Sequence, residues 1–257
     1  MNAWERGKDM LYKVEGIVIR SMDYGEGNKI ITIYSKTHGK IGIMAKGAKK
    51  LKSRHAGVSQ LFTYGEFMFY KTSGLGSLNQ GEILTAHHKI RGDLHLAAYA
   101  AYLVEMVDRM VEDTEASEFL FEQLKAALDA FEEGKDPQII VRMFEMKMLH
   151  FSGVAPVLDA CVHCGRDEPP FSLSPGMGGL LCRLCRLRDP RGISVTEGTV
   201  KLLNVFQQVD LRRLGNITVK HETRLQLKQC MRAYMDIHVS IPFRSLHFLD
   251  QMDKYDI

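Results

Sequence analysis

Four cysteines in one stretch of the chain have the spacing of a metal site. Cys161 and Cys164 form one C-x2-C pair, and Cys182 and Cys185 form a second pair seventeen residues further on. Two such pairs can place four thiolates around one tetrahedral ion, which leaves no open position for catalysis. The intervening segment is rich in proline and glycine and is expected to form loops that do not fold unaided. The spacing therefore predicts a structural Zn²⁺ site.

Other uses of these cysteines fit the sequence less well. Disulfide bonds are typical of secreted proteins, and the N-terminal residues have no apolar stretch of a secretory signal. A redox C-x-x-C pair normally follows a strand in a βαβ setting, and the pattern around this pair has none. His163 lies inside the first pair and is interpreted as a bystander. Cys230 has helical spacing with apolar residues and is interpreted as a buried thiol.

Positive charge is concentrated near the front of the chain. Residues 1–90 hold 14 Lys/Arg and 7 Asp/Glu, whereas residues 91–257 hold 20 and 24, so the net charge of +3 is unevenly spread. One tract has six basic residues and no acid: Lys40, Lys46, Lys49, Lys50, Lys52 and Arg54. Basic side chains bind nucleic acid by displacing the counterions of its phosphates. The tract predicts such a contact, and the alternative is a solvated loop whose lysines keep a strand edge from pairing.

Nucleic-acid grooves also need aromatic faces on which bases stack. The candidates are Tyr24, Tyr34, Phe62, Tyr64, Phe67, Phe69 and Tyr70, of which at least half are expected to fill a core, and Tyr34 is the one assigned to the interface. A second basic string around the second cysteine pair either extends the track or forms a solvated rim; it comprises Arg183, Arg186, Arg188 and Arg191. Residues 105–133 are strongly acidic, which indicates a solvated surface or a docking face for a basic protein.

The elements that must position these residues change type near residue 90. Strands are expected at 12–20, 29–35, 40–46, 64–71 and 81–88, separated by turn signals. Five short strands without a helix between them predict a small closed barrel of the OB type. Helices are expected at 93–110, 120–131, 136–153, 196–209 and 223–239. The predicted class is α+β, with an OB-fold over 10–90 and a helical domain over 91–257 that carries an inserted zinc module at 159–190.

The order of these segments resembles that of a known family. The stretch "YKVEGIVIRSMDYGEGNKIITIYSKTHGKIGIMAKGAKKLKSR", then "LNQGEI", "AAYAAYLVEMVDRM", the four-cysteine module and "DLRRLGN" resemble the RecO family of bacterial recombination mediators. The likeness runs from about Met10 to the C-terminus, so either residues 1–9 are an N-terminal extension or Met10 is the natural initiator. It implies the same OB-fold, helical domain and zinc module, and a role in DNA repair that is not enzymatic.

The resemblance also implies partners. RecO-like proteins bind single- and double-stranded DNA and anneal complementary strands. With RecR they help RecA replace the single-stranded-DNA-binding protein, whose acidic C-terminal tail they contact. We therefore expect a protein of the bacterial cytoplasm that is associated with the nucleoid and not with a membrane. Three alternatives stay open: an RNA-binding OB and zinc module, a DNA-processing enzyme with a composite site, and a protein–protein adaptor. No Walker, G-x-S-x-G or H-E-x-x-H motif occurs in the sequence.

Overall fold

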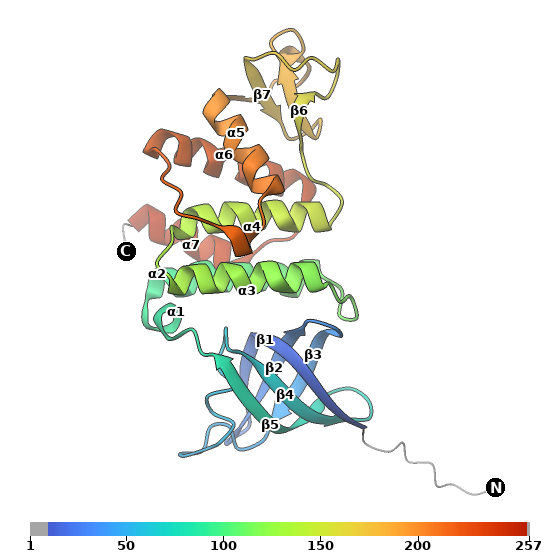
Figure 1. The fold of residues 1–257 in the computed structure, drawn as a ribbon, viewed down its shortest axis with the longest axis vertical. Helices are drawn as coiled ribbons and strands as arrows, with labels where there is room; N and C mark the ends of the chain where they lie inside the picture. Colours follow the sequence, from blue (N-terminus) through green and yellow to red (C-terminus); the bar gives the residue numbers. More distant parts are fainter. Residues whose placement is uncertain (1–9, 256–257) are drawn as a thin grey trace, which may run out of the picture. The chain divides into compact units, whose positions relative to one another are not determined.

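The computed structural model describes residues 10–255 and shows an α+β protein (Figure 1). The chain divides into two compact units, Met1–Glu132 and Glu133–Ile257. The described part of the first unit holds a five-stranded barrel and three α-helices, and that of the second holds four α-helices and a small sheet. The predicted class and the predicted N-terminal five-stranded barrel are therefore confirmed.

The barrel closes through both antiparallel and parallel pairing. Its strands are β1 (Met10–Tyr24), β2 (Asn28–Ser35), β3 (Gly39–Ala45), β4 (Tyr64–Lys71) and β5 (Gly76–Thr85). They follow the order β1-β2-β3-β5-β4, and only β3 and β5 pair in parallel. The fifth strand was expected at 81–88, but β5 begins earlier in the chain. The Gly- and Ser-rich residues that were expected to form a turn are paired with β4 instead.

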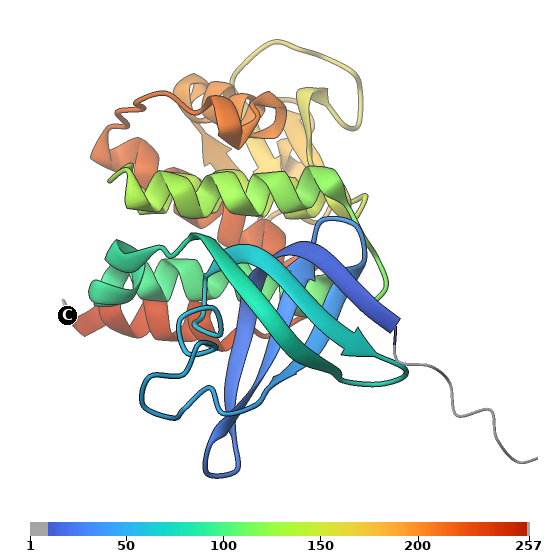
Figure 2. The same ribbon diagram turned by 60° about the horizontal axis from the view of Figure 1, so that its bottom comes forward.

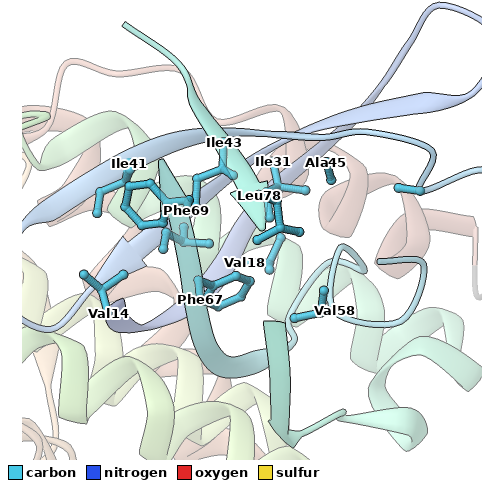
Figure 3. Close-up of a cluster of buried hydrophobic side chains, with 12 residues drawn as sticks. Val14, Val18, Ile31, Ile41, Ile43, Ala45, Val58, Phe67, Phe69 and Leu78 are labelled. Atoms are coloured by element: carbon cyan, nitrogen blue, oxygen red, sulfur yellow. The ribbon is translucent and has the colours of Figure 1, made fainter. Parts of the chain in front are cut away.

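Alternating side chains of the strands fill the barrel (Figure 3). Along β3, Ile41, Ile43 and Ala45 are buried while their neighbours are half-buried, as the two-residue period of a strand predicts. Phe67 and Phe69 of β4 enter the same cluster. These two aromatic side chains therefore belong to the core and are not available to a ligand.

Three helices belong to the same unit as the barrel. They are α1 (His88–Gly92), α2 (Leu94–Met110), which begins after the predicted cap Asp93, and α3 (Glu118–Glu132). The α2–α3 connection touches the start of β3, where the Lys40 N–H donates to the Asp113 carbonyl at 2.7 Å. Gly39 has a φ of +68°, and a Cβ there would lie 2.6 Å from the Asp113 oxygen. Figures 1 and 2 show α2 and α3 lying across this end of the barrel.

One helix of the second unit is buried along most of its length. This helix is α4 (Pro137–Phe151), which is capped by Asp136 as predicted and is buried along residues 139–149. The others are α5 (Glu197–Gln208), α6 (His221–His238) and α7 (Arg244–Tyr255), the last of which was not predicted. Of these, α5 and α6 pack against α4. In the described residues no helix has the length and apolar character needed to cross a membrane.

The cysteine module is more regular than its composition suggests. Between α4 and α5 it forms β6 (Val157–Cys161), β7 (Phe171–Ser174), β8 (Gly179–Cys182) and β9 (Ile193–Val195), in the order β6-β8-β7-β9. The expectation of loops alone is wrong for these residues. Strands of three to five residues are too short to show a readable period.

Candidate nucleic-acid interface and metal centre

The basic tract lies on the long connection between β3 and β4, residues 46–63 (Figure 2). The connection consists of consecutive turns and leaves the barrel at the end of β3. Because β3 rises about 3.3 Å per residue, this end lies roughly 20 Å from Gly39 and the acidic α2–α3 connection. The tract is thus well separated from those acids along the barrel.

This connection is anchored to the barrel by backbone and side-chain contacts. The ring of His55 is buried and contacts the carbonyl oxygens of Lys46 at 3.1 Å and Asn79 at 3.3 Å. The Gly47 N–H donates to Oδ1 of Asn28 at 2.8 Å. Ala48 and Val58 belong to the barrel core. The lysines are therefore presented from an ordered support, and no pattern in the sequence indicates that His55 and Asn28 provide it.

Four cations of the tract are free of carboxylate partners. Lys46, Lys50, Lys52 and Arg54 are exposed, and none forms an ion pair with any residue in the range 10–255. Lys49 differs, because its Nζ lies 2.7 Å from Oδ2 of Asp23 on β1. This hydrogen bond lowers the pKa of Asp23. The free cations form a concentrated positive surface, to which a polyanion would be attracted.

Lys40 does not belong to this surface, contrary to the sequence-based assignment. Its Nζ donates to the Asp108 carbonyl at 2.7 Å and pairs with Oδ1 of Asp113 at 3.0 Å. Its side chain is only 9% exposed. Lys40 therefore joins the barrel to the helices, at the opposite end of β3 from the other lysines.

Tyr34 also cannot present its ring to a base in this structure, because the residue is fully buried. Its ring packs 6.3 Å from that of Phe121 on α3, and burial raises the pKa of its hydroxyl to about 12. The exposed aromatic residue near the tract is Tyr24, at the β1–β2 hairpin. The N–H of Lys49 donates to the Gly27 carbonyl of that hairpin at 3.1 Å. Tyr24 thus replaces Tyr34 as the stacking candidate.

The acidic segment supplies counter-charges to the barrel of its own unit. Nζ of Lys36 lies 2.9 Å from Glu122 and 3.1 Å from Glu118, and hydrogen bonds to both raise its pKa. Arg20 pairs with Asp108 at 3.6 Å. Together with the Lys40–Asp113 pair, these contacts give α2 and α3 a structural role. Neither of the two predicted roles for this segment, solvated surface or docking face, included it.

A buried histidine makes a further contact between the barrel connection and α3. The ring of His87 lies 2.7 Å from the Phe62 carbonyl through Nδ1 and 3.1 Å from Oδ1 of Asp129 through Nε2. Lys125 also donates to Asp129, at 2.8 Å. These contacts outweigh the burial that would raise the pKa of Asp129, and its pKa is lowered. His87 therefore links the C-terminal end of the β3–β4 connection to α3.

The four predicted cysteines converge on one point. Their Sγ atoms all lie within 4.8 Å of one another, and those of Cys164 and Cys182 are 3.7 Å apart. A tetrahedral Zn²⁺ with Zn–S bonds of about 2.3 Å requires sulfur separations of about 3.8 Å. These residues could hold a metal ion. His163 is exposed and is not among the clustered ligands.

The clustered thiols differ in their pKa values because each has different neighbours. Burial raises the pKa of Cys161, but backbone N–H groups outweigh it and lower the pKa to about 6. Burial and the three neighbouring thiols raise the pKa of Cys185 to about 12. Four thiolates in one cluster repel one another unless a cation neutralises them, and a bound metal deprotonates its thiols. Cys230 is buried elsewhere, as predicted, with its pKa raised by burial to about 12.

The second basic string surrounds the second cysteine pair. Its arginines are all exposed; they are Arg183, Arg186, Arg188 and Arg191. The last three follow or form the short 3-10 helix η1 (Arg186–Arg188). Two leucines between these arginines, Leu184 and Leu187, are 69% and 84% exposed. This segment therefore carries arginines that have no carboxylate partner next to leucines that are exposed to solvent.

Comparison with known proteins identifies the family. The family model described as "Recombination protein O N terminal" matches residues 10–87, and that described as "Recombination protein O C terminal" matches residues 91–247. The chain belongs to the RecO family. Proteins named DNA repair protein RecO from Bacillus subtilis and Halalkalibacterium halodurans are 46% and 43% identical over 245 residues, which cover 95% of this chain and 96% of each relative. The RecO of Bacillus cytotoxicus is 44% identical over 248 residues, 96% of this chain and all of that relative.

The two family models meet between residues 87 and 91, at the end of the RecO barrel. The compact units of this RecO chain instead divide after Glu132, because α1, α2 and α3 pack with the barrel. Both divisions leave the basic tract in the first part and the cysteine module in the second.

Proposed function

We propose that this chain is a recombination mediator in DNA repair. In this proposal it binds DNA electrostatically and is not an enzyme. The observation that carries the proposal is the group of free cations on the anchored β3–β4 connection of a RecO-family barrel. Phosphate contacts of this kind depend steeply on salt and little on sequence. We expect the chain to bind single- and double-stranded DNA through Lys46, Lys50, Lys52 and Arg54, with a weaker contribution from Lys49.

Annealing follows from the same charge. Two complementary strands repel each other through their phosphates, and a surface that neutralises both lets them approach. The exposed ring of Tyr24 beside the tract offers one face on which a base can stack. The cysteine centre has four protein ligands and acts, in this proposal, as a structural Zn²⁺ site that supports the second unit.

Partners are proposed from the family. We expect the chain to act with RecR, to contact the acidic C-terminal tail of the single-stranded-DNA-binding protein, and to promote loading of RecA. The place of action would be the bacterial nucleoid. The matching assay measures annealing of complementary strands coated with single-stranded-DNA-binding protein, with and without RecR.

The decisive variant is Lys49→Glu/Lys50→Glu/Lys52→Glu. It should reduce DNA affinity by at least tenfold and abolish annealing, while circular dichroism and metal content stay unchanged. A matched variant reverses three exposed basic residues of the second unit, Lys201, Arg213 and Lys220, and should retain most of the affinity. Unchanged binding by the first variant would remove the tract from the interface.

A further inference from the structure

The second cysteine pair continues into a short segment with a three-residue period. The Cys185 N–H donates to the Cys182 carbonyl at 3.0 Å, and the Arg188 N–H donates to the Cys185 carbonyl at 3.0 Å. Residues 183–185 form a turn and the 3-10 helix η1 covers only Arg186–Arg188, so the two bonds belong to two successive turns that share Cys185. Cys182 and Cys185 thus form one row, which faces the other two sulfurs and is buried.

The geometry of the cysteine row leaves two other rows facing solvent. One contains Arg183 and Arg186, and the other contains Leu184 and Leu187. We call these four residues the knuckle rows. Because the two cysteines must face the other sulfurs, the arginines and leucines of this segment face solvent.

The leucine row is unusual in its exposure. Among the described residues, the three most exposed large apolar side chains are Leu51 at 94%, Leu187 at 84% and Leu184 at 69%. Each directly follows a basic residue: Lys50, Arg183 or Arg186. Single exposed leucines are common on protein surfaces, but two in register beside a row of arginines form a continuous mixed surface.

The arginine row has no counter-charge of its own. Arg183, Arg186 and Arg188 form no ion pair with any residue that the structure describes. Asp189, the nearest acid along the chain, is engaged elsewhere. It accepts from the Ser174 hydroxyl at 2.6 Å and from the Arg191 N–H at 2.9 Å, and these contacts lower its pKa.

The knuckle rows lie on an ordered part of the cysteine module. The rows follow β8 of the four-stranded sheet, and Nε2 of His238 on α6 lies 2.8 Å from the Pro175 carbonyl in the same module. A preorganised surface loses little conformational freedom when it binds.

We propose that the knuckle rows are a second binding site for single-stranded nucleic acid, in which the arginines contact phosphates and the leucines contact the faces of unpaired bases. The proposal rests on the proposed DNA-binding function and adds to it a site and a preference for unpaired strands. A duplex offers phosphates to the arginines but keeps its base faces stacked, so the leucines would stay in water. The arginines have no ion pair among the described residues, and a nucleic-acid strand supplies a regular line of phosphates to such a positive surface.

The test uses the full-length, metal-loaded protein and fluorescence anisotropy. The probes are an oligothymidylate of about 30 nucleotides, longer than the ~4–16 nucleotides that one OB-fold occupies, and a duplex of equal length. Leu184→Gln/Leu187→Gln removes the leucine row without changing charge. The matched control is Leu225→Gln/Ile237→Gln, which alters two exposed apolar residues of α6.

The leucine variant should bind the oligothymidylate roughly threefold to tenfold more weakly, because an apolar contact with a base is worth less than aromatic stacking. Its duplex affinity and its salt dependence should stay unchanged. Arg183→Gln/Arg186→Gln should weaken both probes and reduce the salt slope for the oligothymidylate by about 1.4, at ~0.7 per phosphate contact. A change in affinity is attributed to the substituted side chains only if the variant has the same metal content as the wild type.

Either of two results with the leucine variant would overturn the proposal. Unchanged oligothymidylate affinity in the leucine variant would show that the row serves another ligand, such as an acidic protein segment. An equal loss on both probes would show that the leucines do not contact base faces. If the Lys49, Lys50 and Lys52 variant keeps full affinity while the knuckle variants lose it, the barrel assignment fails and the knuckle site stands. A wild type that binds neither probe would overturn both.

Discussion

The Lys50→Gln/Lys52→Gln variant tests the barrel interface most directly. Both lysines are exposed on the anchored connection and have no ion pair within residues 10–255, so their loss leaves no carboxylate unpaired. Each phosphate contact with a single strand contributes about 0.7 to the slope of log K against log salt. Removing two contacts should therefore lower the slope by about 1.4. If the contribution vanishes near 1 M salt, the affinity falls about 25-fold at 0.1 M and about fivefold at 0.3 M.

The assay is a salt titration of oligothymidylate binding by fluorescence anisotropy. The matched control, Lys201→Gln/Lys220→Gln, removes the same charge from exposed positions in the second unit and should change the slope by much less. Equal slopes for the two variants would mean that only net charge matters, and the local argument for the tract would be refuted. A loss of affinity that does not change with salt would equally refute it.

Four further predictions concern the partners of single residues. Asp23→Asn should release Lys49 and raise single-strand affinity about fivefold at 0.1 M salt, measured by the same titration. Lys40→Gln should lower the free energy of unfolding by about 1–2 kcal/mol in urea titrations and leave DNA affinity unchanged, because Lys40 bonds to the α2–α3 region. Cys164→Ser should abolish stoichiometric zinc in mass spectrometry of the purified protein, whereas Cys230→Ser should retain it. Asp129 has a lowered pKa in the fold, so it stabilises the protein above its unfolded pKa of about 4 and loses this effect as the pH falls further. Asp129→Asn should therefore cost about 1–2 kcal/mol at pH 7 and progressively less as the pH falls below about 4, as urea titrations at a series of pH values would show.

Local patterns in the sequence predicted most of the elements. The strand predicted at 40–46 overlaps β3, and the helices predicted from residues 93, 136 and 196 begin at the observed caps Asp93, Asp136 and Thr196. The cysteine spacing identified four residues that do converge. Each of these signals depends on residues that are neighbours in the chain, which is why a single sequence reveals them.

Signals that depend on distant partners were missed. Lys40 looks equivalent to Lys50 in the sequence, and only its contact with Asp113, 73 positions later, separates the two. Tyr34 was assigned to the interface because nothing near it in the chain indicates that α3 covers its ring. The first half of β5 has a turn-like composition and becomes a strand through pairing with β4.

The ion pairs between the barrel and the acidic helices bear on how the molecule can be dissected. A fragment cut at residue 90, between the two family models, would lose the counterions of Arg20, Lys36 and Lys40 and would uncover the ring of Tyr34. Such a fragment would carry three liberated charges, of which Lys36 and Lys40 lie at the end of the barrel away from the tract. It would then attract polyanions at a place that the intact protein keeps neutral. Measurements on an isolated barrel would overestimate its affinity for DNA unless the fragment extended to Glu132.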